Sequence, residues 1–320
     1  MQDFLRVALL MAQSGYCRGL MRGIMSYAKP AKPWVFRMTD PQLPFSGSRI
    51  GRWRPQGVIA FLGATDALQS ITGLRCPIVN TSASLVDLKL PRVGADDFLV
   101  GQLAAEHFLE RGFKRFLFCS GTQGFFQMRK KGFVSALAAA GFKLDQNEDR
   151  LDAQVSIWNI NAQDFARRLA AAPKPVAMFV ASDPICWQVA ELCHSTGVPV
   201  PEEIALLGVD NDEFMCGLAV PQLSSVQLSL ERIGFEAAKL LDALVRGDRA
   251  PRQPILIPPV RVVTRQSTDI VAVSDPDLAE ALGFIREHAC RPISVSDVVR
   301  HLNISRKALE LKFRRALDRT

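Results

Sequence analysis

An alternation of short apolar runs with helix-length segments is the strongest constraint on how this chain folds. A strand-length run that lacks polar alternation is typical of a strand buried on both faces of a parallel sheet. Because parallel strands are joined by crossover helices, the alternation predicts an α/β fold. Five such runs stand out, at residues 4–12 (FLRVALLMA), 57–62 (GVIAFL), 115–119 (RFLFC), 176–181 (VAMFVA) and 204–209 (IALLGV).

Helical periodicity fills the spaces between these runs, and shorter strands flank them. Helices are predicted at residues 16–27, 65–73, 98–111, 126–140, 161–172, 184–196 and 229–246. Further strands are predicted at 34–38, 77–79, 92–94, 151–155 and within 255–265. The units form two successive series with the same rhythm, which predicts two similar lobes with parallel sheets.

The two series lead to a domain assignment for the whole chain. We expect a two-lobed domain over residues 1–268, a polar linker over 269–276 and a small all-α unit over 277–320. Lobe 1 is expected to comprise about 1–120 and 228–250, and lobe 2 about 121–227 and 251–265. Ligands of open parallel sheets bind beyond the carboxyl ends of the strands, so two facing lobes predict a ligand in the cleft between them.

The last part of the chain has a different pattern, which predicts two short helices. Apolar residues recur at helical spacing from Val295 to Leu302, and Asn303 with Ile304 interrupts them. Ser305 is a favourable N-cap for a second helix, whose apolar residues are Leu309, Phe313 and Leu317. Two short helices joined by a tight turn form the frame of a helix-turn-helix.

Positive charge concentrates on this predicted helix pair. The chain has a net charge of +7. Between Arg300 and Thr320 there are seven basic residues and only two acidic ones, Glu310 and Asp318. Such a concentration suits phosphate contacts, and it suits a solvated basic helix equally well. The exposed side of the second helix is predicted to carry Arg306, Lys307, Lys312, Arg314, Arg315 and Arg319.

Polar residues at the ends of two buried strands are the ligand-binding candidates. Asp210 and Asn211 (followed by Asp212) come after the strand at 204–209, where they suit the hydroxyls of a sugar or, alternatively, satisfy their own turn. Ser182 and Asp183 follow the strand at 176–181, and either residue also suits a helix cap. Arg129 can fork two hydroxyls or pair with a cleft carboxylate, or it can lie in solvent beside its basic neighbours.

No catalytic or metal-binding pattern is present in the sequence. The four histidines lack metal-ligand spacing, and no nucleophile elbow, P-loop or dinucleotide fingerprint occurs, so we expect no enzyme, cofactor or metal. The seven scattered cysteines contain no CxxC pair, which favours free thiols. The apolar run near the start is too short for a signal peptide or a membrane span, so we expect a cytoplasmic protein without a membrane partner.

Several segments together resemble known regulator families. VALLMAQSGYCRGLMRGI, VGADDFLVGQLAAEHFLERGFKRFLF, ASDPICWQVAELCHSTGVPVPEEIALLGVDND and LSSVQLSLERIGFEAAKLLDALV are similar to the effector domain of LacI/GalR-type regulators, which has the type I periplasmic-binding-protein fold. ISVSDVVRHLNISRKALELKFRRAL resembles the first helix-turn-helix of the AraC family. PPVRVVTRQSTD with DPDLAEALGFIREHAC is similar to the junction in xylose-responsive members, which join the two modules in this order.

The resemblance implies a sugar-responsive DNA-binding regulator of sugar-catabolism genes, with a pentose such as xylose as effector. Asp210 and Arg129 match the family's sugar-binding aspartate and arginine, whereas Ser182 stands where many relatives have asparagine. Gly15, Tyr16 and Arg18 match the part of lobe 1 that faces the ligand. The alternative function is a periplasmic-type sugar-binding transport protein that does not bind DNA.

The resemblance also implies roles for the second helix of the pair. Ser305, Arg306, Lys307 and Glu310 are expected at its base-reading front, and Arg314 and Arg315 on phosphates of a double-stranded operator. The apolar Leu311 departs from the family pattern. Relatives carry two helix-turn-helix units, so we expect this chain to hold the first half only. Homodimerisation through lobe 1 and contact with RNA polymerase are further expectations.

Overall fold

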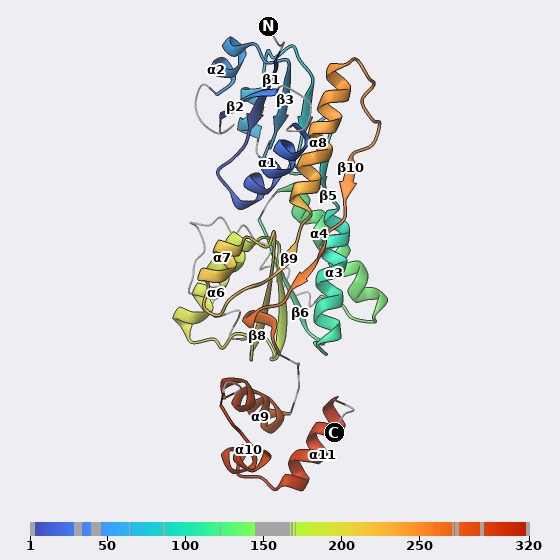
Figure 1. The fold of residues 1–320 in the computed structure, drawn as a ribbon. Coiled ribbons are helices and arrows are strands. Elements are labelled where there is room, and N and C mark those ends of the chain that lie inside the picture. The colour runs from blue at the N-terminus through green and yellow to red at the C-terminus, as the bar shows by residue number, and fades with distance from the viewer. Residues whose placement is uncertain are drawn as a thin grey trace.

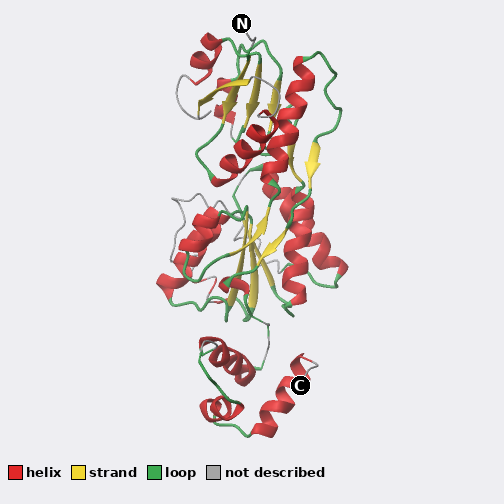
Figure 2. Ribbon diagram, in the orientation of Figure 1, coloured by secondary structure: helices red, strands yellow, loops and turns green. Residues whose placement is uncertain are grey.

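The computed structural model shows two α/β lobes and a small helical unit (Figures 1 and 2). It describes residues 4–28, 34–39, 46–63, 65–85, 87–121, 123–144, 167, 169, 171–270, 272, 275–288 and 291–317. The strand predicted at 151–155 and most of the helix predicted at 161–172 lie outside these ranges. None of the helices in this part of the chain is long and apolar enough to cross a membrane.

Lobe 1 is built on a parallel sheet with the strand order β2-β1-β3-β4. Val7 of the central strand β1 lies opposite Phe36 of β2 and Gly57 of β3. A parallel pair, β5 with β10, continues the lobe toward its neighbour. The elements of lobe 1 are β1 (Leu5–Leu10), α1 (Gly15–Ala28), β2 (Trp34–Thr39), α2 (Ser46–Trp53), β3 (Gly57–Ala60), η1 (Thr65–Ser70), β4 (Ile78–Asn80), β5 (Val93–Ala95), α8 (Leu230–Val245) and β10 (Ile255–Ile257).

Lobe 2 is built on a sheet with the order β11-β9-β8-β7-β6, in which only β11 is antiparallel to its neighbour. Helices cover both faces, α3 and α4 on one and α6 and α7 on the other (Figure 1). Every residue of β7 and of β8 is buried, as their unbroken apolar runs predict. The elements are α3 (Asp97–Glu110), β6 (Phe116–Cys119), α4 (Gly124–Ala139), β7 (Val176–Val180), α6 (Asp183–Thr196), β8 (Ile204–Val209), α7 (Glu213–Leu218), β9 (Ser224–Gln227), β11 (Arg261–Val263) and η3 (Gln266–Thr268).

A cluster of phenylalanines forms the core between the sheet of lobe 2 and the α3–α4 pair. The ring of Phe133 on α4 lies 5.1 Å from Phe179, 6.2 Å from Phe116 and 6.4 Å from Phe108, centroid to centroid. All four side chains are fully buried. Truncation of one such ring typically costs ~3–5 kcal/mol, so this cluster fixes α3 and α4 firmly on the sheet.

Two glycines bring α3 and α4 into backbone contact. A Cβ atom on Gly101 would lie 2.0 Å from the carbonyl oxygen of Arg129, and one on Gly132 would lie 1.9 Å from that of Phe98. Both distances are far below van der Waals contact, so no larger residue fits without moving a helix. We call this contact the α3–α4 seam.

Lobe 1 has an equivalent seam between α1 and α8. A Cβ atom on Gly23 would lie 1.8 Å from the carbonyl oxygen of Glu231, and one on Gly234 would lie 2.0 Å from that of Leu20. The seam joins two helices that are about 200 residues apart in sequence. It therefore ties the returning helix α8 to the first half of its lobe.

The predicted lobe boundaries differ from the structure. The run at 115–119 was expected to close lobe 1, but it forms β6 at the edge of the lobe 2 sheet, and α3 belongs to lobe 2 with it. The stretch at 251–265 is divided, because β10 pairs with β5 and β11 pairs with β9. A fully buried strand suits either sheet equally well, so its sequence does not reveal which sheet it joins. The chain thus crosses between the lobes near residues 95–97, 227–230 and 257–261.

The C-terminal unit contains α9 (Pro276–Glu287), α10 (Val295–Leu302) and α11 (Arg306–Leu317). Ala281, Val298 and Leu309 form its small core, one from each helix. A capping box between Ser294 and Asp297 begins α10, and Asn303 ends it with a left-handed φ of +52°. The structure therefore contains the two predicted helices and the predicted turn between them.

Candidate functional site

The loop after β8 has a strained backbone at the end of a buried strand. Asp210 has φ +111° and Asn211 has φ +51°, values that cost roughly 1–3 kcal/mol each in residues other than glycine. Bonds from the surroundings hold the loop: the Asp210 amide donates to the Val226 carbonyl (3.0 Å), and the Asn211 amide donates to Ser225 Oγ (3.0 Å). Arg265 Nη2 also donates to Asn211 Oδ1 (2.8 Å). Strain that is maintained in this way is typical of a functional site.

Arg129 occupies the space beside this loop and is almost completely buried. Its Nε donates to Asp97 Oδ1 (2.9 Å), its Nη1 donates to the Ala181 carbonyl, and its Nη2 lies 4.0 Å from Asp210 Oδ1. The guanidinium carbon is 4.9 Å from the ring centre of Phe125. The arrangement places one fixed cation between two carboxylates, with an aromatic face beside it.

Burial and charge shift the pKa values of this cluster. Burial raises the pKa of Asp97, although Arg129 opposes the increase. Burial also raises the pKa of Asp210 to about 7, again with Arg129 opposing and Asp97 adding to the increase. Burial lowers the pKa of Arg129, but attraction to Asp97 and Asp210 outweighs it and leaves this pKa above its usual value. Near neutral pH the cluster therefore offers both hydrogen-bond donors and acceptors to a polar ligand.

Residues from both lobes surround a cavity of about 200 Å³ at this cluster, which we call the inner cavity. Tyr16 and Phe61 of lobe 1 form a wall, with ring centres 5.4 Å apart, and Tyr16 donates its hydroxyl to the Thr81 carbonyl (3.1 Å). The volume is several times the ~30 Å³ that one water occupies in the liquid, so a small polar molecule fits. The lining residues are Ala12, Ser14, Tyr16, Phe61, Thr81, Ser82, Ala83, Gly94, Ala95, Asp97, Phe125, Arg129, Ser182 and Asp210.

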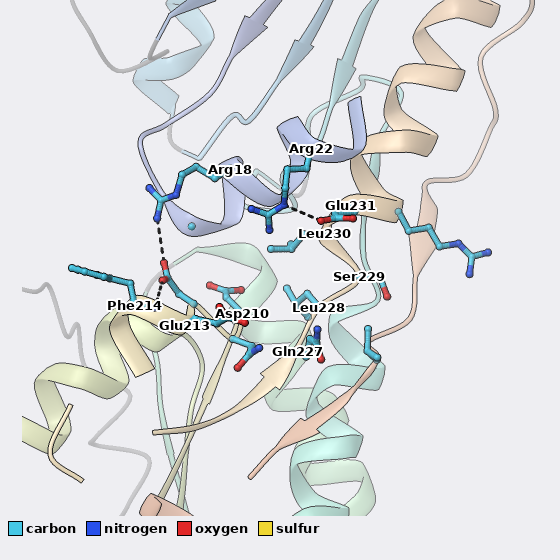
Figure 3. Close-up of a pocket in the computed structure, with 15 residues that line it drawn as sticks. Arg18, Arg22, Asp210, Glu213, Phe214, Gln227, Leu228, Ser229, Leu230 and Glu231 are labelled. Carbon is cyan, nitrogen blue, oxygen red and sulfur yellow. Dashed lines mark hydrogen bonds and ion pairs between the residues drawn. The ribbon is translucent and has the colours of Figure 1, made fainter. Parts of the chain in front are cut away.

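A larger and more open space of about 710 Å³, the outer chamber, adjoins the other side of Asp210 (Figure 3). Across it, Arg18 Nη2 of lobe 1 lies 3.7 Å from Asp212 Oδ2 of lobe 2. Gly15 makes this approach feasible, since a Cβ atom there would lie 2.0 Å from Asp212 Oδ2. Arg22 points instead to Glu231, and its Nε lies 2.8 Å from Glu231 Oε1 (Figure 3).

The predicted ligand residues reach these spaces with one exception. Arg129, Asp210, Tyr16 and Ser182 line the inner cavity, and Gly15, Arg18 and Asn211 line the outer chamber. Ser182 precedes α6 without making a side-chain capping bond.

Asp183 lies outside the lining of both spaces and is completely buried. Its carboxylate accepts from Ser225 Oγ (2.6 Å), the Asp212 amide (2.8 Å) and Cys216 Sγ (3.4 Å). Burial, together with the charge of Asp210, raises its pKa to about 8. Asp183 thus lines neither space, unlike the other predicted ligand residues, because the first turn of α6 directs its side chain under the 210–212 loop, which it supports.

The helix α11 carries the predicted DNA-contacting residues on an exposed surface. Ser305 Oγ accepts from the Ala308 amide (3.2 Å), as predicted for an N-cap. Arg306 Nε bonds to Glu310 Oε1 one turn later (2.9 Å), and both side chains are exposed. Lys307 and Arg314 are exposed as well, and the side chain of Arg315 lies outside the described residues.

Lys312 does not belong to this exposed row, contrary to prediction. Its Nζ lies 2.5 Å from Asp275 Oδ2 and 3.0 Å from Asp277 Oδ2, at the start of α9. The adjacent Leu311 is 48% exposed instead. The basic residues of α11 therefore divide into a surface row and one residue that fastens α11 to α9.

Comparison with known proteins places the two-lobed part of the chain. The family described as the periplasmic binding protein-like domain matches residues 105–268, just over half of the chain. The chain belongs to this family. The match contains Arg129, Asp210 and all of the described lobe 2 strands, so this periplasmic binding protein-like domain includes most of the charged cluster.

Relatives of known name match almost the whole chain. The xylose operon regulatory protein of Escherichia coli (strain K12) is 28% identical over 98% of this chain and 82% of its own length. That of Haemophilus influenzae is 26% identical over 100% of this chain and 84% of its own length. The solved structure of the xylose-binding transcription activator xylR aligns with a TM-score of 0.75 and 28% identity, covering 100% of this chain and 84% of that one. The transcriptional regulator CelR–cellobiose complex (TM-score 0.68, 22% identity, 82% of this chain and 84% of that one) shares the fold.

Several residues of the site escaped prediction. Asp97 is the most important, because it shares Arg129 with Asp210. In the sequence it appears beside Asp96 before a helix, where either residue suits an N-cap; Asp96 is the cap, bonding the Leu99 amide (3.1 Å). Two adjacent acidic residues at a helix start were thus a usable signal for a site residue, since only one of them can cap the helix and the other is left for another role. Phe61, Thr81 and Arg265 gave no such signal.

Proposed function

We propose that this protein is a sugar-responsive transcriptional regulator whose effector is a neutral monosaccharide, a pentose such as xylose, bound in the inner cavity. The observation that carries the proposal is the position of Arg129 between Asp97 and Asp210 in a small cavity with aromatic walls. The full-length likeness to xylose operon regulatory proteins supports both the sugar and the regulatory role.

The chemistry of the inner cavity suits sugar hydroxyls. A sugar offers donors and acceptors in a ring, and Arg129 donates while the carboxylate of Asp210 accepts. The faces of Phe61 and Phe125 cover the apolar C–H surface of such a ring. Because one cation already stands between two carboxylates, an anionic ligand would meet repulsion, which favours a neutral one.

The output of the proposed regulator is the α10–α11 pair at a double-stranded operator. In this proposal α11 lies in the major groove with Arg306, Lys307 and Glu310 toward base edges, while Arg314 and Arg315 hold phosphates. A bound sugar shifts the balance between lobe arrangements only by its difference in affinity for them. The same proposal includes the division of the chain into sensor, linker and DNA-binding unit. It also includes homodimerisation through lobe 1 and contact with RNA polymerase.

A thermal-shift panel of pentoses and hexoses tests the sugar assignment. A sugar present at 100 times its Kd stabilises the folded protein by ~2.7 kcal/mol, which is readily measured. We expect at least one pentose to raise the melting temperature of the wild type, and Asp210→Ala to abolish that increase. Asp248→Ala removes an exposed carboxylate that lines neither the inner cavity nor the outer chamber, and it should leave the increase unchanged. If no sugar raises the melting temperature of the wild type, the proposed function is wrong.

A further inference from the structure

The helix α3 extends from the inner cavity to the segment that leads to the DNA-binding unit. Asp97, in its first turn, lines the cavity and pairs with Arg129. Arg111 stands directly after its last turn, about 21 Å away at ~1.5 Å per residue. Figure 1 shows α3 running along lobe 2 from the gap between the lobes toward the end where the chain leaves for α9.

Arg111 holds the departing segment through several bonds. Its Nε donates to the Thr268 carbonyl (3.0 Å) and its Nη2 donates to Thr264 Oγ1 (3.2 Å). Its Nη1 donates to the His107 carbonyl (3.1 Å), which orients the guanidinium. Its own carbonyl accepts from the Ala272 amide (2.8 Å). A planar fork with several fixed donors is suited to holding one backbone geometry, so this segment is attached where α3 ends.

His107 adds a buried chain of hydrogen bonds with a defined direction. Thr268 Oγ1 donates to Ser224 Oγ (2.7 Å), and Ser224 Oγ donates to the Arg265 carbonyl (2.9 Å). Each hydroxyl has one proton, so His107 Nε2, 2.8 Å from Thr268 Oγ1, must be the donor of the remaining bond. Burial, with Arg111 nearby, lowers the pKa of His107 to about 3, so the ring is neutral.

The α3–α4 seam makes the two helices move together. Asp97 belongs to α3 and Arg129 to α4, and the backbones touch at Gly101 and Gly132. Sliding of α3 along α4 would drive a side chain into a carbonyl oxygen, because only glycine fits at these points. A displacement of the charged pair at the cavity is therefore carried to Arg111 and His107 as a displacement of the whole helix pair.

We propose that Arg111 is a positioning residue that couples the inner cavity to the linker and so sets the orientation of the DNA-binding unit. The nature of the ligand rests on the proposed function, whereas the attachment of the linker by Arg111 does not. On this proposal, loss of the Arg111 side chain frees the linker and removes its response to sugar, while the cavity itself stays intact.

Hydrogen–deuterium exchange of the full chain, with and without D-xylose, tests the proposal in peptides covering residues 264–275. In the wild type, xylose should change exchange in these peptides. Arg111→Ala should speed exchange there at least tenfold without sugar and remove the xylose-dependent change, while calorimetry finds a xylose Kd within twofold of wild type. Arg111→Lys, which keeps the charge but loses the fork, should be intermediate. Arg115→Ala is the matched control, because among the described residues the Arg115 side chain makes one long hydrogen bond, to the Lys174 carbonyl (3.5 Å).

The outcomes separate this inference from the proposed function. If Arg111→Ala binds xylose normally and its linker exchange and xylose response match the wild type, the inference is wrong and the sugar assignment stands. If Arg111→Ala loses xylose binding in proportion to a lower melting temperature, its role is only structural and the inference is again wrong. If the wild type binds no sugar, both the proposed function and the coupling fail, whatever the exchange without sugar shows.

Discussion

Asp210→Asn should make the sugar-free protein more stable and should lower its affinity for the sugar. The pKa of Asp210 is raised from 3.8 to about 7, mainly by burial. Between these two pH values the unfolded chain has released the proton while the folded protein retains it, so stability falls as pH rises. Over about three pH units at ~1.36 kcal/mol each, ionisation of Asp210 costs folding about 4 kcal/mol by pH 8. Asparagine has the shape of the neutral acid, tolerates positive φ and has no charge to bury.

Urea unfolding of both proteins at several pH values is the measurement. We expect the variant to exceed the wild type by about 4 kcal/mol at pH 8, by roughly half of that near pH 5.5 and by almost nothing near pH 4. Asp248→Asn, at an exposed position that lines neither the inner cavity nor the outer chamber, serves as the control. A difference that stays constant with pH, or a variant less stable than wild type at pH 8, would refute the reasoning.

The same substitution should weaken xylose binding. Hydrogen bonds to a charged group contribute ~1.5–3 kcal/mol, so replacing the carboxylate of Asp210 should raise the Kd about 10- to 100-fold. Calorimetry at pH 8 measures this effect beside the gain in stability. On the proposed function, the two effects have opposite signs because the strained, charged loop serves binding at the expense of folding stability.

Three further predictions concern other parts of the molecule. Gly132→Ala should lower the free energy of unfolding by ~1–3 kcal/mol in urea, because its Cβ would lie 1.9 Å from the Phe98 carbonyl oxygen, whereas Gly217→Ala meets nothing within 4 Å and should not. Arg306→Ala should weaken DNA binding in fluorescence anisotropy more for the cognate operator than for unrelated DNA, and an equal loss on both would reassign it to a phosphate contact. The depressed pKa of His107 (about 3, from 6.5) predicts that stability falls as pH drops below 6.5. His107→Gln should flatten this acid limb of the urea stability profile, and an unchanged limb would contradict the prediction.

The sequence allowed prediction of the elements that depend on local patterns. The unbroken apolar runs of β7 and β8 correspond to wholly buried strands, and the apolar run of β1, interrupted only by Arg6, corresponds to a strand that is buried from Val7 to Leu10. Ser305 caps α11 as its residue type predicts. The strand β9 was not predicted, because its sequence SSVQ carries two serines that hydrogen-bond inward, to Arg265 and Asp183, and so reads as polar.

Prediction failed where a residue's role depends on distant partners. Asp97 and Arg129 are 32 positions apart and meet only because two glycines let α3 and α4 touch. Lys312 resembles its basic neighbours in sequence, yet it turns to carboxylates 35 or more positions earlier. Asp183 and Ser182 look equally suited to the cleft in the sequence. In the structure Ser182 lines the inner cavity, whereas the first turn of α6 directs Asp183 under the 210–212 loop. These choices are made by tertiary packing, which no local pattern records.

The glycine seams decide how the cleft between the lobes is able to open. A sliding motion requires helices whose side chains exchange partners, and backbone contact at Gly23 or Gly132 allows no such exchange. We therefore expect α1 and α8 to move as one pair and α3 and α4 as another, with relative movement of the lobes at the three crossings near 95–97, 227–230 and 257–261. Because the first crossing ends at Asp97, the cavity residue that holds Arg129 also stands at the pivot. On the proposed function, a ligand bound there lies next to this crossing and at the start of α3, and the linker is attached at the other end of the same helix.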